Sequence, residues 1–141
     1  MKLEILATTA LLSTMCLAAP VKAANPAQVR HLMQTGECRG CDLEGANLRS
    51  AHLIGSDLRK ANLKGANLNA ANLEGADLTG ANLKGANLTQ VFASDASLKD
   101  TNLTDVKLSG AKLYNTDMNG AVLAGTDLRG AKLYGADLSR Y

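Results

Sequence analysis

Apolar and polar positions follow a strict period of five from Cys41 to Arg140. Leu occupies the central position in eighteen of the twenty units, and a small residue, Ala in thirteen of them, lies two positions earlier. An amphipathic helix repeats its apolar residues at three and four positions, and a half-buried strand repeats them at two. The period of five therefore favours neither element and predicts a solenoid of short, self-similar units.

The polar positions of each unit carry turn-forming residues. Asn or Asp precedes the central residue in thirteen units, and Gly follows it by two positions in eleven. Gly accepts positive φ angles, and Asn and Asp side chains bond the nearby backbone. Each unit is therefore expected to bend, with the central and small residues pointing inward and three residues pointing outward.

Units such as Ala61-Asn62-Leu63-Lys64-Gly65 resemble the A(D/N)LXX motif of the pentapeptide-repeat family, and the resemblance is continuous over 41–140. It implies an all-β solenoid, a right-handed quadrilateral β-helix in which four units make one coil. Twenty units then give about five coils, and at a strand-like spacing of roughly 4.8 Å per coil the rod would be about 24 Å long.

The N-terminal segment 1–23 reads as a signal peptide. Lys2 gives it a positive start, an apolar run follows over 5–19, and Ala23 ends a small-residue cleavage site. The run is short for a membrane span, so no stable membrane insertion is expected after cleavage; the alternative is an uncleaved anchor. The resemblance to exported cyanobacterial members suggests the periplasm or the thylakoid lumen, with an extracellular location as the alternative.

Residues 24–40 are expected to cap the first coil, ahead of a repeat domain over 41–141. Asn25 suits an N-cap and Pro26 suits a first helical turn, which predicts a short helix over 26–35. The apolar face of this helix consists of Val29, Leu32 and Met33. Laid on the open end of the first coil, that face would protect an edge that otherwise invites association.

Cys38 and Cys41 are the two cysteines of the mature chain. Extending the register backwards places both at inward positions, and export favours their oxidation to a disulfide. A pair of packed thiols would serve the same structural purpose. A redox-active pair is a second alternative. Metal binding is the weakest, because His31 and His52 lack a recognised ligand spacing.

Every fourth unit lies on the same side of a four-sided coil, so the outward residues can be sorted by side. One side differs from the others by gathering apolar, aromatic and lysine side chains. We call it the aromatic face: Ile54, Phe92, Lys112, Tyr114, Lys132 and Tyr134. Protein interfaces are enriched in aromatic residues. The face is predicted to dock an unidentified partner protein; the alternative is chance decoration.

Phe92 has two candidate positions. The next residue, Ala93, is a small central residue, which predicts a void between Leu73 and Leu113. A local bulge would turn Phe92 inward to fill that void, whereas an unperturbed unit would leave the ring on the aromatic face.

Charge and composition narrow the function further. Without the leader the chain has thirteen basic and twelve acidic residues, which offers no case for binding nucleic acid or an anionic membrane. A leucine-filled core leaves no cleft, and no catalytic, cofactor or metal motif is present. Asp57, Asp77, Asp117 and Asp137 form an aligned column that fits the family motif; a cation site along this column is the weaker alternative. We expect a non-enzymatic structural or protein-docking scaffold. The alternatives are the topoisomerase shielding known for some family members, and a thiol–disulfide role of Cys38 and Cys41.

The repeats run to Arg140, and Tyr141 follows. Two arrangements would cover the apolar end of the last coil. Either Tyr141 folds over it, or two rods meet end to end as a homodimer.

Overall fold

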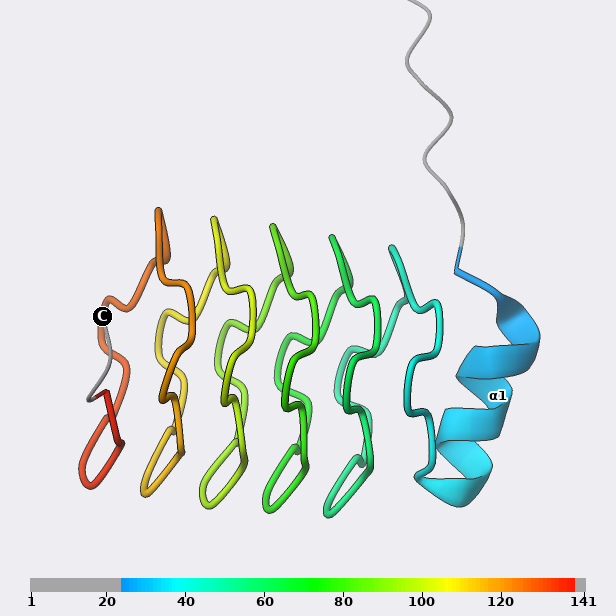
Figure 1. Cartoon of the computed structure of the whole chain (residues 1–141), viewed down its shortest axis with the longest axis horizontal. Helices are drawn as coiled ribbons and strands as arrows, with labels where there is room; N and C mark the ends of the chain where they lie inside the picture. Colours follow the sequence, from blue (N-terminus) through cyan, green and yellow to red (C-terminus); the bar gives the residue numbers. More distant parts are fainter. Residues whose placement is uncertain (1–23, 139–141) are drawn as a thin grey trace, which may run out of the picture.

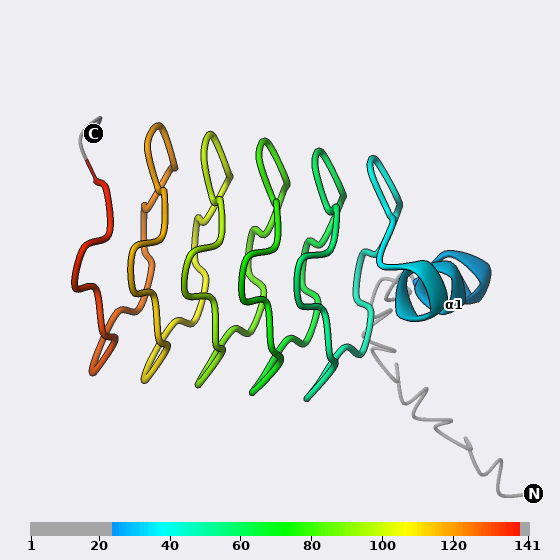
Figure 2. The same cartoon turned by 90° about the horizontal axis from the view of Figure 1, so that it is seen from below.

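The computed structural model describes residues 24–138 as one helix, α1 (Pro26–Thr35), followed by a stack of four-sided coils. The coils lie side by side along one axis, with α1 against the first coil and the C-terminal coil at the opposite end (Figures 1 and 2). Over these residues, no helix has the length and apolar character needed to cross a bilayer. The predicted leader, 1–23, and Tyr141 lie outside the described residues.

Hydrogen bonds between coils join residues twenty positions apart. Within the described range, each side of a coil contributes a single parallel bridge in place of a continuous strand, from Glu37–Asp57 to Asp117–Asp137. In a typical bridge, the N–H of Leu63 donates to the Asn82 carbonyl at 2.8 Å, and the Asn82 N–H donates to the Ala61 carbonyl at 3.0 Å. This alternation is that of a parallel ladder, so neighbouring coils satisfy one another's backbone groups.

The corners of the coils are β-turns. At one corner the N–H of Ala66 donates to the Leu63 carbonyl at 3.0 Å, and Gly65 between them has a φ of +64°. A positive φ at the third residue is the requirement of a type II turn and explains the repeated Gly. Among the described residues, eight that are not Gly hold the same conformation, with φ from 52° to 58°. The turn geometry therefore persists where the sequence departs from Gly.

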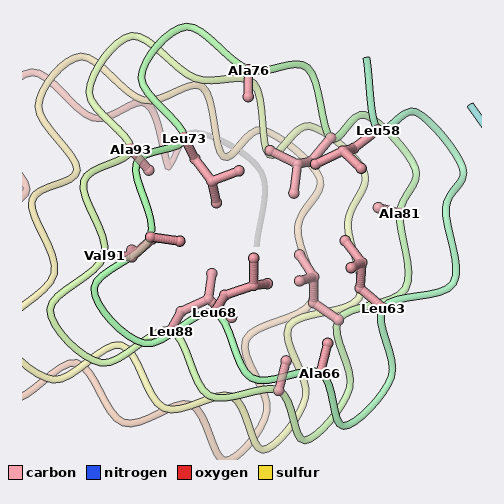
Figure 3. Packing of buried hydrophobic residues seen from close by; sticks show 14 of the residues in the cluster. Leu58, Leu63, Ala66, Leu68, Leu73, Ala76, Ala81, Leu88, Val91 and Ala93 are labelled. Carbon is pink, nitrogen blue, oxygen red and sulfur yellow. The ribbon is translucent and has the colours of Figure 1, made fainter. Parts of the chain in front are cut away.

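The interior consists of inward Leu and small residues stacked coil upon coil (Figure 3). Leu58, Leu63, Leu68 and Leu73 are fully buried, and their side chains point into the space between the four sides. This apolar column is removed from water along most of the rod, which makes burial and the coil-to-coil backbone bonds the main sources of stability.

The unit with the small centre keeps Phe92 outside. Ala93 is 1% exposed, and the ring of Phe92 stays on the surface with 40% of its area exposed. Val91 stands where most units have Ala; it is fully buried, and its side chain points into the interior beside Leu88 and Leu68 (Figure 3). The added methyl groups of Val91 thus contribute volume in the unit whose central side chain is short, and no inward bulge of Phe92 forms.

Helix α1 is capped at both ends. The Asn25 side chain accepts the N–H of Ala27 at 3.0 Å, and Gly36 ends the helix at a φ of +74° with its N–H donating to the Leu32 carbonyl at 2.8 Å. These are the N-cap and left-handed C-cap that the flanking residues favour.

The packing face of α1 is narrower than the sequence suggests. Leu32 is buried and Val29 is partly buried against the core, but Met33 is 50% exposed. The expectation that Met33 packs on the first coil is therefore wrong. One residue further along a helix turns the side chain by about 100°, so Met33 lies on the rim of the face defined by Val29 and Leu32.

Helix α1 also supplies hydrogen-bond acceptors that a preceding coil would provide. In the second coil, the Asn62 N–H donates to the Cys41 carbonyl of the coil before it at 2.8 Å. For Asp42 the corresponding acceptor is the side-chain Oε1 of Gln28, at 2.5 Å. The N–H of Asp57 similarly donates to the carbonyl of Gly36, the helix C-cap, at 2.9 Å. The helix thus continues the backbone ladder as well as the apolar column.

Candidate docking face

The Asn or Asp before each central residue has a structural purpose. Its side-chain oxygen accepts the backbone N–H two residues later, as when Asp77 accepts from Thr79 at 2.9 Å and Asn102 from Thr104 at 3.1 Å. Twelve such bonds span 2.9 to 3.4 Å, and Ser97 makes a longer one at 3.5 Å. These Asx turns fix the outward loop of each unit.

Departures from this pattern concentrate on one side of the rod. Of the twenty units in 41–140, six carry at this position a residue that is neither Asx nor Ser, and four of the six share the side that holds the aromatic face: His52, Phe92, Lys112 and Lys132. Asn72 alone keeps the bond on that side, donated by Glu74 N–H at 3.0 Å. The other two, Lys107 and Val122, lie on two different sides. The side that holds the aromatic face therefore lacks the stabilising Asx-turn hydrogen bond in four of its five units.

The structure brings five of the six predicted face residues together on three consecutive coils. Bridges align Phe92 with Lys112, and Lys112 with Lys132. The Nζ atom of Lys112 lies 4.5 Å from the centroid of the Phe92 ring, within the range of a cation–π contact. Tyr114 and Tyr134 follow in the next outward position, 38% and 84% exposed. Ile54 is exposed on the same side, but the coil containing Asn72 separates it from Phe92.

The two lysines of the face differ from Lys64 on the opposite side. Lys64 lies 3.3 Å from a carboxylate oxygen of Glu44, and Lys84 follows one coil later. Within residues 24–138, neither Lys112 nor Lys132 lies within salt-bridge distance of a carboxylate. The aromatic face therefore combines exposed rings with two positive charges that the rod itself does not neutralise by direct pairing.

The adjacent side carries the aspartate column and has a different electrostatic character. The Arg59 side chain donates to both carboxylate oxygens of Asp57, and these bonds lower the pKa of Asp57 to about 2. The Nε of Arg59 also lies 3.7 Å from Asp77. Among the described residues, no group of three or more His, Cys, Asp or Glu side chains is arranged to hold a metal ion. The column is explained by Asx turns and a local ion pair.

Cys38 and Cys41 meet beneath α1. Their sulfurs are joined in a disulfide with the Cα atoms 5.2 Å apart, Cys38 is 2% exposed, and Cys41 is partly buried. Both occupy the inward positions expected from the register: the Cys38 N–H donates to the Asp57 carbonyl at 2.8 Å. The Sγ of Cys38 lies 3.6 Å from the carbonyl oxygen of Gln28. The pair thus sits where the helix meets the first coil.

Comparison with solved structures places this architecture among known solenoids. A pentapeptide repeat protein from the Arabidopsis thaliana thylakoid lumen is 27% identical with a TM-score of 0.61, covering 81% of this chain and 72% of its own. QnrB1, a plasmid-mediated fluoroquinolone resistance protein, is 22% identical with a TM-score of 0.59; the match covers 70% of this chain and half the length of QnrB1. No match was found among curated proteins.

Both structures have the fold that the sequence implies, a right-handed quadrilateral β-helix. The family model for pentapeptide repeats matches residues 37–75, 66–105 and 101–140. These overlapping segments include the whole ladder of bridges and begin at the unit that contains Cys38. The chain therefore belongs to the pentapeptide-repeat family.

Proposed function

We propose that this chain is an exported, non-enzymatic docking scaffold that binds a partner protein through its aromatic face. The observation that carries the proposal is the loss of the Asx turn in four of the five units on that side. A sequence that is locally consistent elsewhere and breaks its own rule in one place is typical of a functional surface. Phe92, Lys112 and Lys132 replace a turn-stabilising side chain with one suited to contact.

The exposed chemistry of the face supports the same role. Phe92, Tyr114 and Tyr134 offer rigid rings whose burial costs little conformational entropy, and rings of this kind are enriched in the energetically dominant positions of interfaces. The coils hold these rings on a backbone ladder, so the face is organised before a partner arrives. A preorganised surface loses less entropy on binding.

An exported location is proposed from the leader-like segment and supported by similarity to a thylakoid-lumen protein. The periplasm and the thylakoid lumen fit best. An oxidising compartment would maintain the Cys38–Cys41 disulfide. We propose a structural role for this pair, because burial of Cys38 under α1 leaves little access for the exposed thiolate that redox exchange requires.

The test is to crosslink and capture partner proteins from the periplasm or the thylakoid lumen with three forms of the protein. The wild type is compared with Tyr114→Ala/Tyr134→Ala and with Lys64→Ala/Lys84→Ala, a pair on the opposite side. Equal urea midpoints for the three forms establish that the substitutions leave the fold intact. The expected result is a partner, identified by mass spectrometry, that is captured by the wild type and the lysine control and lost with the tyrosine variant. Capture that survives in the tyrosine variant would remove the aromatic face from the proposal.

A further inference from the structure

We infer that the partner presents an acidic, amphipathic α-helix lying along the rod on the aromatic face. The inference rests on the proposed function and specifies its partner. The first observation is that Lys112 and Lys132 are aligned on consecutive coils by a backbone β-bridge. Neither lysine has a carboxylate within salt-bridge distance among the described residues. A partner that docks here meets two stacked positive charges beside three exposed rings, and matching charge is what selects one partner over another.

The acidic residues that flank this end of the face, Glu74 and Asp95, lie outside salt-bridge distance of Lys112 and Lys132. Lys64, on the opposite side, already has its charge partner in Glu44 at 3.3 Å. On the aromatic face the nearest turn residues, Asp95 and Asn115, bond to each other at 3.2 Å, with the Asn115 amide donating. The carboxylate of Asp95 is thus held by its own neighbour at the corner. The two lysines are left to an incoming carboxylate.

The spacing of the coils favours a helix over an extended segment. Neighbouring coils lie roughly 4.8 Å apart, as bridged strands do. Residues four apart on a helix have Cβ atoms about 5–6 Å apart. Residues on one face of an extended strand are about 6.6–6.8 Å apart, since each residue advances roughly 3.3–3.4 Å. Acidic residues at i and i+4 of a helix therefore fit Lys112 and Lys132 with the smaller mismatch.

The rings fix which face of the helix is apolar. Tyr114 and Tyr134 lie on the two coils of the lysines, in the neighbouring outward position, and Phe92 lies one coil earlier in the same column as the lysines. A stripe of apolar residues next to the acidic stripe would cover the two tyrosines. Phe92 is already in contact with the Lys112 ammonium, so an arriving carboxylate and an apolar side chain would extend an existing contact.

The test uses two synthetic peptides of about 18 residues with identical composition. The matched peptide carries Glu at i, i+4 and i+8 beside a stripe of Leu, and the scrambled peptide distributes the same residues around the helix. Binding of each to the purified chain is measured by fluorescence anisotropy at low salt and at roughly 0.5 M salt. The same titrations are made with Lys112→Gln/Lys132→Gln and with the control Lys64→Gln/Lys84→Gln.

The matched peptide is expected to bind the wild type and the control equally. Its dissociation constant should rise about fivefold in Lys112→Gln/Lys132→Gln, the loss that two exposed ion pairs produce, and high salt should abolish the difference. Equal binding of both peptides, equal binding to both lysine variants, or no binding at about 1 mM peptide would overturn the inference.

A lipid surface is the competing occupant and has its own outcome. Lysine-dependent sedimentation with anionic phospholipid vesicles, without peptide binding, would assign the face to a membrane and overturn the helix. Failure of the inference is also separable from failure of the proposed function. If crosslinking capture is lost in Tyr114→Ala/Tyr134→Ala and unchanged in Lys112→Gln/Lys132→Gln, the docking face stands and the acidic helix does not.

Discussion

The Oδ1 atom of Asp100 occupies the space that a Cβ on Gly120, one coil later, would need. The same relationship joins Asp105 to Gly125 and the Asn115 side chain to Gly135. In each pair a non-glycine residue in the left-handed conformation lies against a glycine of the next coil. Corners on neighbouring coils are therefore coupled, although each unit has a turn of its own.

This coupling predicts unequal costs for glycine substitutions. In Gly65→Ala the new Cβ meets no atom within 4 Å. The only cost should be the strain of holding Ala in the left-handed conformation, about 1 kcal/mol. Gly120→Ala also forces the Asp100 carboxylate, the end of a flexible side chain, to rotate away, and should cost about 0.5–1 kcal/mol more than Gly65→Ala. In the double variant Asp100→Gly/Gly120→Ala the excess should disappear. Urea unfolding measures all three, and equal losses for the two single variants would show that the corners are independent.

Restoring the Asx turn on the aromatic face should stabilise the protein. In His52→Asn and Lys132→Asn, the new side chain can accept the N–H two residues later, as Asn72 does from Glu74. One added hydrogen bond of this kind should raise the free energy of unfolding by about 0.5–1 kcal/mol. The reverse change, Asn72→Lys, should lower it by a similar amount. The thermal midpoint should rise in the two Asn variants and fall in Asn72→Lys. If the midpoints do not move in these opposite directions, the Asx turn does not contribute to stability.

The same two Asn variants test whether Lys132 contributes to partner binding at the expense of stability. Lys132→Asn should gain stability and weaken partner capture, whereas His52→Asn, two coils beyond Phe92, should gain stability without affecting capture. A Lys132→Asn variant that captures the partner at wild-type level would mean that Lys132 is not part of the contact.

The Asp57–Arg59 pair predicts acid sensitivity. Arg59 lowers the pKa of Asp57 in the folded protein to about 2, below its ordinary value of 3.8, so the pair contributes stability above about pH 4. That contribution is lost as the pH falls from about 4 to 2 and Asp57 is protonated in both states. Asp57→Asn keeps an acceptor for the Arg59 N–H but removes the charge. Its unfolding free energy should therefore fall less steeply than that of the wild type over this window, and parallel curves would contradict the assignment.

Gln28 should protect one particular amide. Gln28→Met removes the acceptor of the Asp42 N–H while keeping side-chain length, and should cost about 1 kcal/mol. Hydrogen exchange of the Asp42 amide should accelerate in this variant more than exchange in later coils. Gln34→Met, at an exposed position of α1, is the matched control and should leave the Asp42 amide unchanged. Equal protection in both variants would mean that α1 closes the first coil without the hydrogen bond from Asp42 to Gln28.

The repeat region could be predicted from sequence because the structure of each unit is determined by residues within that unit. A Leu turned inward, an Asx that bonds two residues ahead and a Gly with positive φ are all decided within five residues, as in Ala61–Gly65. Because every fourth unit lies on the same side of the coil, the residues on each side can be assigned from their positions in the sequence.

Features that depend on neighbouring segments were not predictable in this way. Phe92 could have turned inward beside Ala93; the outcome is decided by Val91 inside and Lys112 outside. The contact of Gln28 with Asp42 joins a helix to a coil across fourteen residues, where no period applies. The exposure of Met33 likewise depends on how α1 is rotated on the first coil.

The bridge spacing of twenty residues separates the length of the rod from the orientation of its surface. Removing twenty residues would shorten the stack by one layer and leave every later side chain in its original direction. Removing five residues between Phe92 and Lys112 would leave each unit its own turn and inward Leu, but would carry Lys112, Tyr114, Lys132 and Tyr134 a quarter-turn around the axis. Insertions and deletions therefore act on this protein as rotations or as extensions, according to whether they come in fives or in twenties.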